Sequence, residues 1–240
     1  MRGIILCGGM GTRLRPLTEI VNKHLLPVYN QPMVVYPLLT LKSLSIKDIL
    51  MVSGGEHIGR FTEFLGDGRK FGINLTYRVQ TKAGGIAEAL GLAKDFTQNE
   101  KIAVILGDNI FETSFLNIPK EIYKNDKAMI FVKEVSNPER FGVLFEKGNK
   151  KWIVEKPKNP KSAKAITGLY IYPNDVFDVI STLVPSARGE LEISDVNNYF
   201  LKENRAEVSN FSGFWSDAGT FDSLLSSANW LKKISNEDLS

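Results

Sequence analysis

The pattern of apolar and polar residues changes about halfway along the chain. The first half alternates short aliphatic runs, each closed by turn residues, with longer stretches in which apolar residues recur at helical spacing. Such runs are typical of buried parallel strands. They predict strands at Gly3–Cys7, Ile49–Ser53, Leu75–Val79, Ile102–Leu106 and Ala128–Val132, and helices at Gln31–Leu44, Ile58–Leu65 and Gly85–Asp95. The alternation predicts an α/β fold with a right-handed, doubly wound and mostly parallel sheet flanked by helices.

The second half mixes strand and helix signals. Gly148-Asn149, between two short runs, indicates a hairpin turn. The expected strands are Gly142–Glu146, Trp152–Glu155, Ala165–Tyr172, Val208–Phe211 and Phe214–Ser216, and the expected helices are Asp175–Leu183, Ile193–Glu203 and Thr220–Lys233. Because no repeat, linker or low-complexity segment interrupts the sequence, residues 1–240 are predicted to form a single Rossmann-like domain with a small added β region.

Composition narrows the class of protein. The 240 residues are 43% hydrophobic and 24% charged, which favours neither disorder nor a membrane class. The net charge of +3 is too balanced to predict nucleic-acid binding. Cys7 is the one cysteine, which excludes an intrachain disulfide, and the first apolar run is too short for a signal peptide or a membrane span. We therefore expect a cytoplasmic protein whose partners are neither nucleic acid nor membrane.

A glycine-rich turn directly follows the first predicted strand. Gly8, Gly9 and Gly11 allow positive φ angles and close approach of a ligand, and successive amides in such a turn cradle an anion. Arg13 lies in the same loop and Lys23 follows it, so amides and two cations near one strand end suit a polyphosphate. Gly8-Gly9 alone would favour a tight turn with solvated cations.

Two better-known phosphate loops do not fit this turn. Leu14 stands where the dinucleotide fingerprint needs glycine or alanine. The Walker pattern needs Gly-Lys-Ser/Thr, which the segment from Gly11 to Arg13 does not supply. The loop therefore belongs to a different class of phosphate site.

Two aspartates each follow a predicted strand. Asp108 comes after Ile102–Leu106, and Asp217 comes after Phe214–Ser216. Two such carboxylates could hold one Mg²⁺ while phosphate oxygens complete its octahedron. A single aspartate at a turn is usually structural, as a cap or an Asx turn. The pair beside a phosphate loop favours a metal site.

Further polar groups and glycines suggest where other parts of a ligand would bind. The Gln80 amide offers a donor and an acceptor that suit the imide edge of a pyrimidine, although a glycine-rich turn with an incidental glutamine is the alternative. Gly142 and Gly168 interrupt predicted strands, which often marks close approach of a ligand. Glu155 and Lys156 could bind a sugar hydroxyl and a phosphate, although this pair alone favours a surface position.

The string from Gly8 to Thr18, with Lys23 to Val28 downstream, resembles the signature of the sugar-nucleotide pyrophosphorylases. Further matches lie at Gly107-Asp108, Glu155-Lys156-Pro157, Arg188–Asp195 and Trp215–Thr220, so the resemblance covers nearly the whole chain. It implies a single nucleotidyltransferase domain whose added β region forms a sugar pocket. The segment from Gly84 to Glu88 looks like the thymidylyl-transferring subgroup.

This resemblance implies a reaction and a role for each matched residue. The substrates would be dTTP and glucose 1-phosphate, the products dTDP-glucose and pyrophosphate, the cofactor Mg²⁺, and the assembly a homo-oligomer, a dimer or a tetramer. The implied roles are catalytic for Arg13 and Lys23; nucleotide-binding for Gly8, Gly9, Gly11, Thr12, Gln80 and Gly85; sugar-phosphate-binding for Asn109, Gly142, Glu155, Lys156, Thr167, Tyr170 and Arg188; and metal-binding for Asp108 and Asp217.

The chain departs from the family pattern at few points. Cys7 and Ala218 stand where alanine and threonine are usual. The chain ends soon after residue 233, whereas longer members continue with helices that help form a regulatory nucleotide site, so we do not expect feedback regulation by that structure.

Other functions compete with this interpretation. A nucleotidyltransferase with uridine or adenine specificity stays open, while the presence of Arg13, Lys23 and Asp108 disfavours a non-catalytic nucleotide-sugar sensor. A glycosyltransferase would want an Asp-x-Asp motif, and the segment from Asp108 to Ile110 lacks the second acid.

Overall fold

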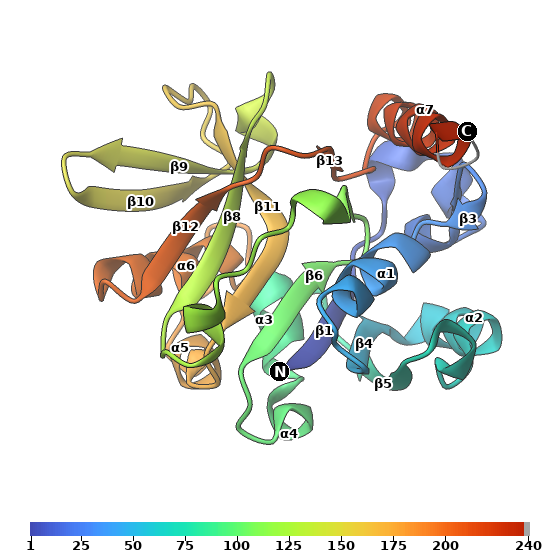
Figure 1. Ribbon diagram of the computed structural model, residues 1–240, viewed down its shortest axis with the longest axis horizontal. Coiled ribbons are helices and arrows are strands. Elements are labelled where there is room, and N and C mark those ends of the chain that lie inside the picture. Colours follow the sequence, from blue (N-terminus) through green and yellow to red (C-terminus); the bar gives the residue numbers. More distant parts are fainter. Residues whose placement is uncertain (238–240) are drawn as a thin grey trace.

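The computed structural model describes residues 1–237, and a nine-stranded sheet forms its centre (Figure 1). Its strands are β1 (Arg2–Cys7), β4 (Asp48–Gly54), β5 (Asn74–Gln80), β6 (Ile102–Leu106), β8 (Ala128–Glu134), β9 (Gly142–Lys147), β10 (Lys150–Glu155), β11 (Lys164–Tyr172) and β12 (Ala206–Asn210). Seven of them run in the order β10-β9-β11-β6-β1-β4-β5, while β8 pairs with β11 and β12 pairs with β8. Residues 238–240 of the predicted single domain lie outside the described residues.

The first four predicted strands form the parallel part of this sheet. β1 pairs in parallel with β4 and β6, and β4 pairs in parallel with β5, which confirms the predicted α/β sheet. The strand expected at residues 128–132 forms as β8, and its expected parallel pairing holds on one side only, because β8 is parallel to β12 and antiparallel to β11. Two consecutive strands that pair in parallel are usually joined by a crossover connection that contains a helix. Between β6 and β8 the chain makes only the short strand β7 (Ile110–Phe111) and two 3-10 turns.

Helices cover both faces of the sheet, as predicted. Side chains alternate along β1, so Ile4 and Leu6 face one helical layer while Ile5 and Cys7 face the other. The Ile5 side is packed by α1 (Val35–Ser43) and α2 (Gly55–Leu65). The Ile4 side is packed by α3 (Ile86–Gly91), α5 (Val176–Ser181) and α6 (Ile193–Lys202). Among the described residues, no helix is both long enough and apolar enough to cross a membrane.

Two predicted helices differ in their bounds. The helix expected from Gln31 begins at Val35, because β2 (Pro27–Val28) and β3 (Gln31–Pro32) first form a small antiparallel pair. The helix expected over residues 85–95 splits into α3 and the single turn α4 (Lys94–Thr97). Ala93 N donates to Leu90 O over 2.9 Å in a tight turn just after Gly91, a residue that weakens a helix.

The second half forms the added β region. β9 and β10 make the predicted hairpin, and β11 contains an irregularity between Ile166 and Tyr170. β13 (Trp215–Ser216) pairs with β7 in a separate two-stranded sheet. The helix α7 (Phe221–Glu237) follows, and Ser223 N donates to Thr220 Oγ1 over 3.2 Å, so Thr220 caps its start.

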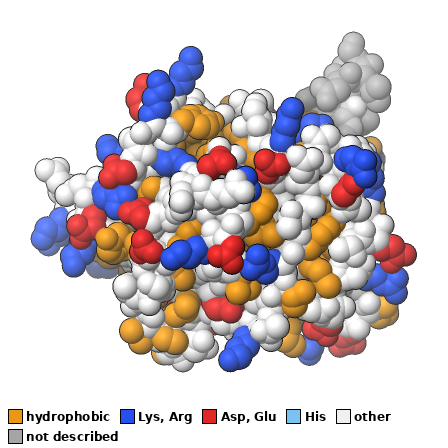
Figure 2. Space-filling model, turned by 90° about the horizontal axis from the view of Figure 1, so that it is seen from below, with side chains coloured by type: hydrophobic (Ala, Val, Ile, Leu, Met, Phe, Trp, Pro, Cys, Tyr) orange, Lys and Arg blue, Asp and Glu red, His pale blue; other side chains and the backbone are white. Residues whose placement is uncertain are grey.

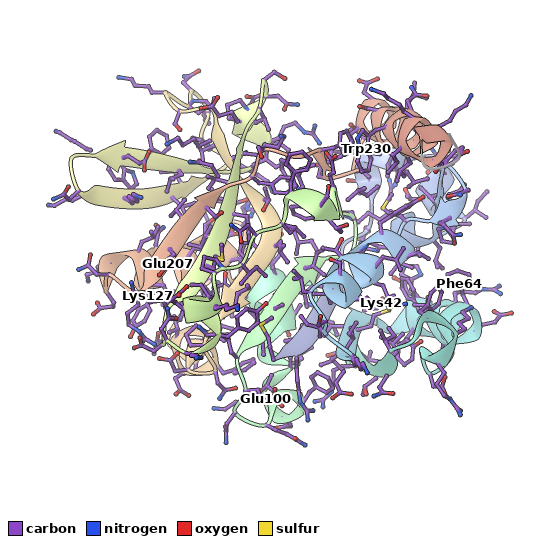
Figure 3. The ribbon with its side chains drawn as sticks, in the orientation of Figure 1. Lys42, Phe64, Glu100, Lys127, Glu207 and Trp230 are labelled. Carbon is purple, nitrogen blue, oxygen red and sulfur yellow. The ribbon has the colours of Figure 1, made fainter. Side chains whose placement is uncertain are left out.

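Side-chain contacts tie the ends of the chain to this frame (Figure 3). The N-terminal ammonium is 2.7 Å from Glu100 Oε2, and Trp230 of α7 stacks on Phe214 with ring centroids 4.3 Å apart. Lys127 and Glu207 bridge the neighbouring strands β8 and β12 over 3.4 Å. Basic and acidic side chains are interspersed on the face shown in Figure 2, in keeping with the small net charge.

Gly107, at the end of β6, packs too closely to accept a side chain. A Cβ atom there would lie 2.5 Å from Cys7 Sγ and 2.8 Å from His24 Cδ2. We predict that Gly107→Ala lowers the free energy of unfolding by about 1–3 kcal/mol through overpacking. The control is Gly59→Ala, in open space within α2, which should leave stability unchanged or raise it. Urea unfolding measures both, and equal midpoints for the wild type and Gly107→Ala would contradict this packing.

Candidate active site

A cavity of about 370 Å³ lies at the carboxyl ends of β1, β5 and β6 and extends to residues of β9–β11. Ligands of open α/β sheets bind at such strand ends. The predicted site residues that line it are Gly8, Gly9, Arg13, Lys23, Gln80, Gly85, Asp108, Asn109, Gly142, Glu155, Lys156, Thr167, Tyr170 and Asp217. Gly11, Thr12 and Arg188 lie outside this lining.

The glycine-rich turn adopts the backbone conformation that its sequence predicts. Gly9 and Gly11 have φ angles of 90° and 62°, which side chains disfavour. A Cβ at Gly11 would also lie 2.9 Å from Thr18 Cγ2, so Gly11 packs against its own loop. Thr12 is exposed at the start of a 3-10 turn. Gly8 and Gly9 therefore face the cavity, while Gly11 and Thr12 shape the loop behind them.

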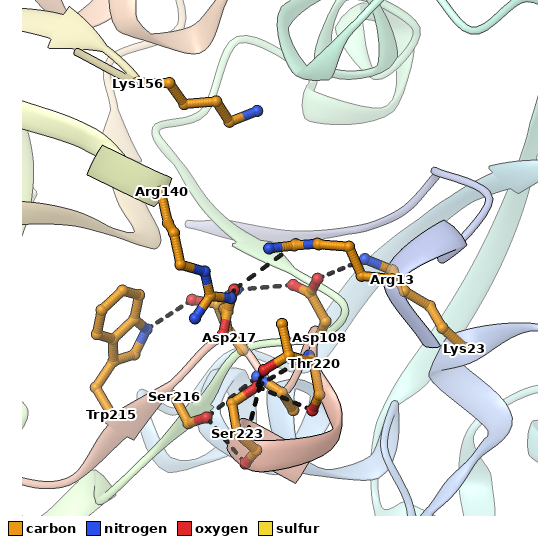
Figure 4. A network of polar contacts seen from close by, with 12 residues as sticks. Arg13, Lys23, Asp108, Arg140, Lys156, Trp215, Ser216, Asp217, Thr220 and Ser223 are labelled. Carbon is orange, nitrogen blue, oxygen red and sulfur yellow. Dashed lines mark hydrogen bonds and ion pairs between the residues drawn. The ribbon is translucent and has the colours of Figure 1, made fainter. Parts of the chain in front are cut away.

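Lys23 and Asp108 form an ion pair at the cavity wall (Figure 4). Lys23 Nζ is 2.5 Å from Asp108 Oδ2, and both side chains are nearly buried. Burial alone would raise the pKa of Asp108, but the charge of Lys23 and the hydrogen bonds to this carboxylate hold it below its ordinary value. Asp108 is therefore a carboxylate at neutral pH, and the positive charge of Lys23 is already held at the end of β6.

His24 lies buried beside this pair and stays neutral. Asn22 Oδ1 accepts from His24 N over 2.9 Å and lies 2.8 Å from Nδ1. Because that oxygen can only accept, Nδ1 carries the ring proton. Burial, followed by the charge of Lys23, lowers the pKa of His24 to about 3. His24 lines the cavity as a neutral ring rather than as a further cation.

The Asn109 side chain connects three parts of the site. Its Nδ2 donates to Asp108 Oδ1 over 2.8 Å. Its Oδ1 accepts from Gly168 N over 3.0 Å and from Trp215 Nε1 over 2.7 Å. A Cβ at Gly168 would lie 2.6 Å from this amide, so the glycine in β11 admits Asn109. The sequence analysis expected a ligand to approach Gly168 closely. In the structure, the Asn109 side chain makes this approach.

Asp217 faces the same space from the loop after β13 (Figure 4). Its Oδ2 accepts from Arg140 Nη2 over 2.7 Å and lies 3.8 Å from Arg13 Nη2. Arg140 comes from the 3-10 turn Pro138–Arg140 and is mostly buried, whereas the Arg13 side chain is 54% exposed. Arg13 is thus the more available of the two guanidinium groups for a ligand.

The two carboxylates suit Mg²⁺ by their chemistry. Within residues 1–237 there is no cluster of three or more His, Cys, Asp or Glu residues that could hold a metal. Mg²⁺, however, is usually bound by one or two carboxylates together with substrate phosphates. Asp108 and Asp217 supply such oxygens on one cavity, and each is balanced by cations that could move to a phosphate.

Glycine and glutamate shape the other predicted binding regions. A Cβ at Gly85, where φ is 99°, would lie 2.5 Å from Leu191 O, so this turn closes against the segment before α6. A Cβ at Gly142 would lie 2.9 Å from Ser194 Oγ, and that hydroxyl donates to Glu155 Oε2 over 2.6 Å. Glu155 is therefore held with its second oxygen, Oε1, near Lys156 and the cavity.

Lys156, Thr167 and Tyr170 complete this part of the lining. Lys156 has a φ angle of 44°, and its backbone N donates to Phe141 O over 3.0 Å. Thr167 Oγ1 donates to Phe131 O over 3.0 Å, so its hydroxyl proton is used inside the protein. Tyr170 is buried, which raises the pKa of its phenol, so the ring contributes a neutral wall.

Arg188 is not brought into the cavity. Its Nη2 lies 2.6 Å from Glu192 Oε2 and 3.2 Å from Glu190 Oε2, and 3.8 Å from Glu155 Oε1. Its guanidinium is shared among two glutamates of the segment before α6 and Glu155 at the end of β10. The predicted contact of Arg188 with a sugar phosphate stays a prediction.

Several residues that line the cavity were given no role in the sequence analysis, among them Arg140, Ser194 and Trp215. Arg140 precedes the Phe141-Gly142 segment, and a cation beside a strand glycine is the signal that could have identified it. Trp215 was part of a matched motif, but its hydrogen bond to Asn109 joins residues far apart in sequence. Ser194 is significant only through its bond to Glu155.

The neutral state of His24 predicts a pH dependence of stability. The pKa of about 3 in the folded protein lies below the ordinary value of 6.5, so the unfolded chain binds a proton in this window that the folded protein does not. Stability therefore falls as the pH decreases from about 6.5, and this one group should contribute about 2 kcal/mol of that loss between pH 7 and pH 5. Urea unfolding at both pH values should show a smaller loss for His24→Gln than for the wild type. Equal losses would mean that His24 is not held neutral.

Comparisons with known proteins agree with this geometry. The family model described as nucleotidyl transferase matches residues 2–233. Glucose-1-phosphate thymidylyltransferase of Neisseria meningitidis is 44% identical over 98% of this chain and 84% of its own length, and that of Mycolicibacterium smegmatis is 44% identical over 98% and 83%.

Solved structures agree as well. The crystal structure of a Bacillus anthracis protein that carries the same name provisionally is 47% identical, with a TM-score of 0.89 over 96% of this chain and 94% of that one. A UDP-glucose pyrophosphorylase shares the fold at 22% identity, with a TM-score of 0.82 over 97% of this chain and 98% of that one. From the family model and these relatives, we conclude that the chain belongs to the nucleotidyl transferase family.

Proposed function

We propose that this protein transfers a thymidylyl group from dTTP to glucose 1-phosphate, giving dTDP-glucose and pyrophosphate. One observation carries the proposal: a single cavity contains Gln80 for a base, Arg13 and Lys23 for phosphates, and Glu155 with Lys156 for a sugar phosphate. The names of the similar proteins support dTTP and glucose 1-phosphate as the substrates.

The reaction is a displacement at phosphorus that needs no proton transfer. An oxygen of glucose 1-phosphate attacks the α-phosphorus of dTTP, and the bond from that phosphorus to the bridging oxygen of the β-phosphate breaks. The electron pair leaves with pyrophosphate. Because the attacking oxygen is already anionic, catalysis consists of positioning the two anions and neutralising their charge.

The residues of the cavity supply these two effects. Lys23 lies at the wall near the strand ends and would stabilise the charge that develops around the α-phosphorus. Arg13, with an exposed guanidinium, would hold the leaving pyrophosphate against the amides of Gly8 and Gly9. Lys156 points into the open space opposite Arg13 and would bind the incoming sugar phosphate (Figure 4).

We propose Mg²⁺ as the cofactor, held by Asp108 and Asp217. When bound, it would neutralise charge on the nucleotide phosphates. The support is the donor set, two carboxylates on one cavity, and their present pairing with Lys23 and Arg140.

We further propose that the protein acts in the cytoplasm as a homo-oligomer, a dimer or a tetramer. The unpaired, buried Cys7 fits a reducing compartment. Exposed apolar side chains on α7, such as Phe221 and Leu225, offer surface that a second subunit could cover. Sedimentation at several concentrations measures the assembly.

Pyrophosphate release tests the proposed reaction. Glucose 1-phosphate and Mg²⁺ are supplied with dTTP, UTP, ATP, CTP or GTP, and we expect the highest kcat/KM with dTTP. Adding a chelator should abolish the release, and adding excess Mg²⁺ should restore it. A preference for another nucleotide would contradict the thymidylyl assignment. Pyrophosphate release that continues in the presence of the chelator would contradict the metal site and leave the rest of the proposal intact.

Lys23 should matter for turnover more than any exposed lysine. We predict that Lys23→Met lowers kcat by about 10²–10³, by analogy with the loss of one group that stabilises transition-state charge. The matched control is Lys158→Met at an exposed position, which should retain wild-type turnover. Near-normal turnover of Lys23→Met, measured with saturating substrates, would exclude Lys23 from the catalytic step.

A further inference from the structure

The Gln80 amide presents two different atoms to its surroundings at the end of β5. Its Nε2 donates a hydrogen bond to Glu88 Oε2 in α3. Its Oε1 lies over the glycine-rich turn, since a Cβ built on Gly8 would be 3.0 Å from it. No donor among residues 1–237 makes a hydrogen bond to this oxygen. The nitrogen is therefore used inside the protein, and the oxygen is free beside the cavity that Gln80 and Gly8 both line.

Glu88 is the group that imposes this orientation. An amide can be reversed, because its oxygen and its nitrogen occupy equivalent positions. An ionised carboxylate, however, only accepts hydrogen bonds, so Glu88 can pair with the Gln80 nitrogen and cannot pair with the oxygen. Reversing the amide would place two acceptors against each other and lose the hydrogen bond.

The position of Glu88 is itself fixed by its loop. Its side chain packs over Gly84, where a Cβ would lie 3.0 Å from Glu88 Cγ. Leu191 N donates to Gly84 O over 2.8 Å, and Ala87 N donates to Leu191 O over 3.2 Å. These bonds hold the start of α3 against the segment before α6, so the carboxylate stays in place.

We propose that Glu88 is a positioning residue that determines base specificity. By holding the amide, it makes Gln80 present an acceptor to the base. Thymine carries a hydrogen on N3 and can donate to that acceptor, whereas cytosine carries a lone pair on N3 and is repelled by it. The inference rests on the proposed function, in which the base of dTTP binds at Gln80. It concerns the pairing edge alone and leaves recognition of the 5-methyl group to other contacts.

The test compares dTTP with 5-methyl-dCTP, which differs from dTTP only at the pairing edge of the base. We measure kcat/KM for both nucleotides with the wild type, with Glu88→Met and with Glu88→Gln. Glu88→Met removes the acceptor and frees the amide, so the dTTP preference should fall by about 10- to 100-fold, as expected for loss of a base-reading contact. Glu88→Gln offers both an acceptor and a donor, so it can pair with either end of the Gln80 amide, and its preference should fall between those of the wild type and Glu88→Met. General loosening of the site would lower both kcat/KM values alike and leave their ratio unchanged.

Two controls isolate the effect. Glu63→Met makes the same change at a side chain that is 71% exposed on α2 and should keep the wild-type ratio. In a Gln80→Ala background, Glu88→Met should change the ratio no further, because the amide through which Glu88 acts is gone.

The outcomes separate this inference from the proposed function. A wild type that uses dTTP, with the same ratio in Glu88→Met, overturns the role of Glu88 and leaves the proposed function intact. An additive effect in the Gln80→Ala background also overturns it. A wild type that uses another nucleotide and not dTTP overturns the proposed function, and this inference with it.

Discussion

The arrangement of the site depends on one buried amide, that of Asn109. Three hydrogen bonds of 2.7–3.0 Å connect it to Asp108 after β6, to the backbone of Gly168 in β11 and to the indole of Trp215 in β13. These segments belong to different parts of the fold. The Asn109 amide can join them because its nitrogen donates to Asp108 while its oxygen accepts from both Gly168 and Trp215. Because all four groups are buried or nearly so, breaking any of these bonds would leave a polar group without a partner, which costs more than the bond contributes. The carboxylate of Asp108 is thereby oriented before any ligand arrives.

A second constraint is the burial of charge next to this amide. Lys23 and Asp108 are both largely removed from water, and each would be costly there without the other. The same burial makes a third charge unfavourable, which is why His24 is held neutral and the Cys7 thiol, whose pKa burial and Asp108 both raise, is held protonated. The site therefore contains one positive and one negative charge at the end of β6. Gly107 leaves room for Cys7 and His24 beside the end of β6, since a side chain at position 107 would overlap both.

Local patterns predicted the features that are set locally. Buried strands produce continuous apolar runs, so β1, β4, β5 and β6 were predicted within one or two residues. The glycine-rich turn was predicted for the same reason, because its φ angles require glycine. Contacts between distant residues were not predictable in this way. Arg140 pairs with Asp217 across 77 positions, and Gly168 meets Asn109 across 59. The pairing of β8 with β11 is likewise a property of the assembled sheet. Arg188 lies beside Glu192 in the structure, and its predicted contact with a sugar phosphate stays a prediction.

The ion pairs of the cavity explain how one site can hold two strongly anionic substrates. Lys23 is paired with Asp108, and Arg140 with Asp217, so the free protein carries no uncompensated charge at these positions. In the proposed reaction, the phosphates compete with the carboxylates for these cations, and the carboxylates are released to a divalent cation. Charge would then be exchanged between partners, so that neither the largely buried cations nor the carboxylates are left unpaired. In that proposal, binding of nucleotide and binding of metal would be coupled through the same two carboxylates, because either event alone would leave a charge without a partner.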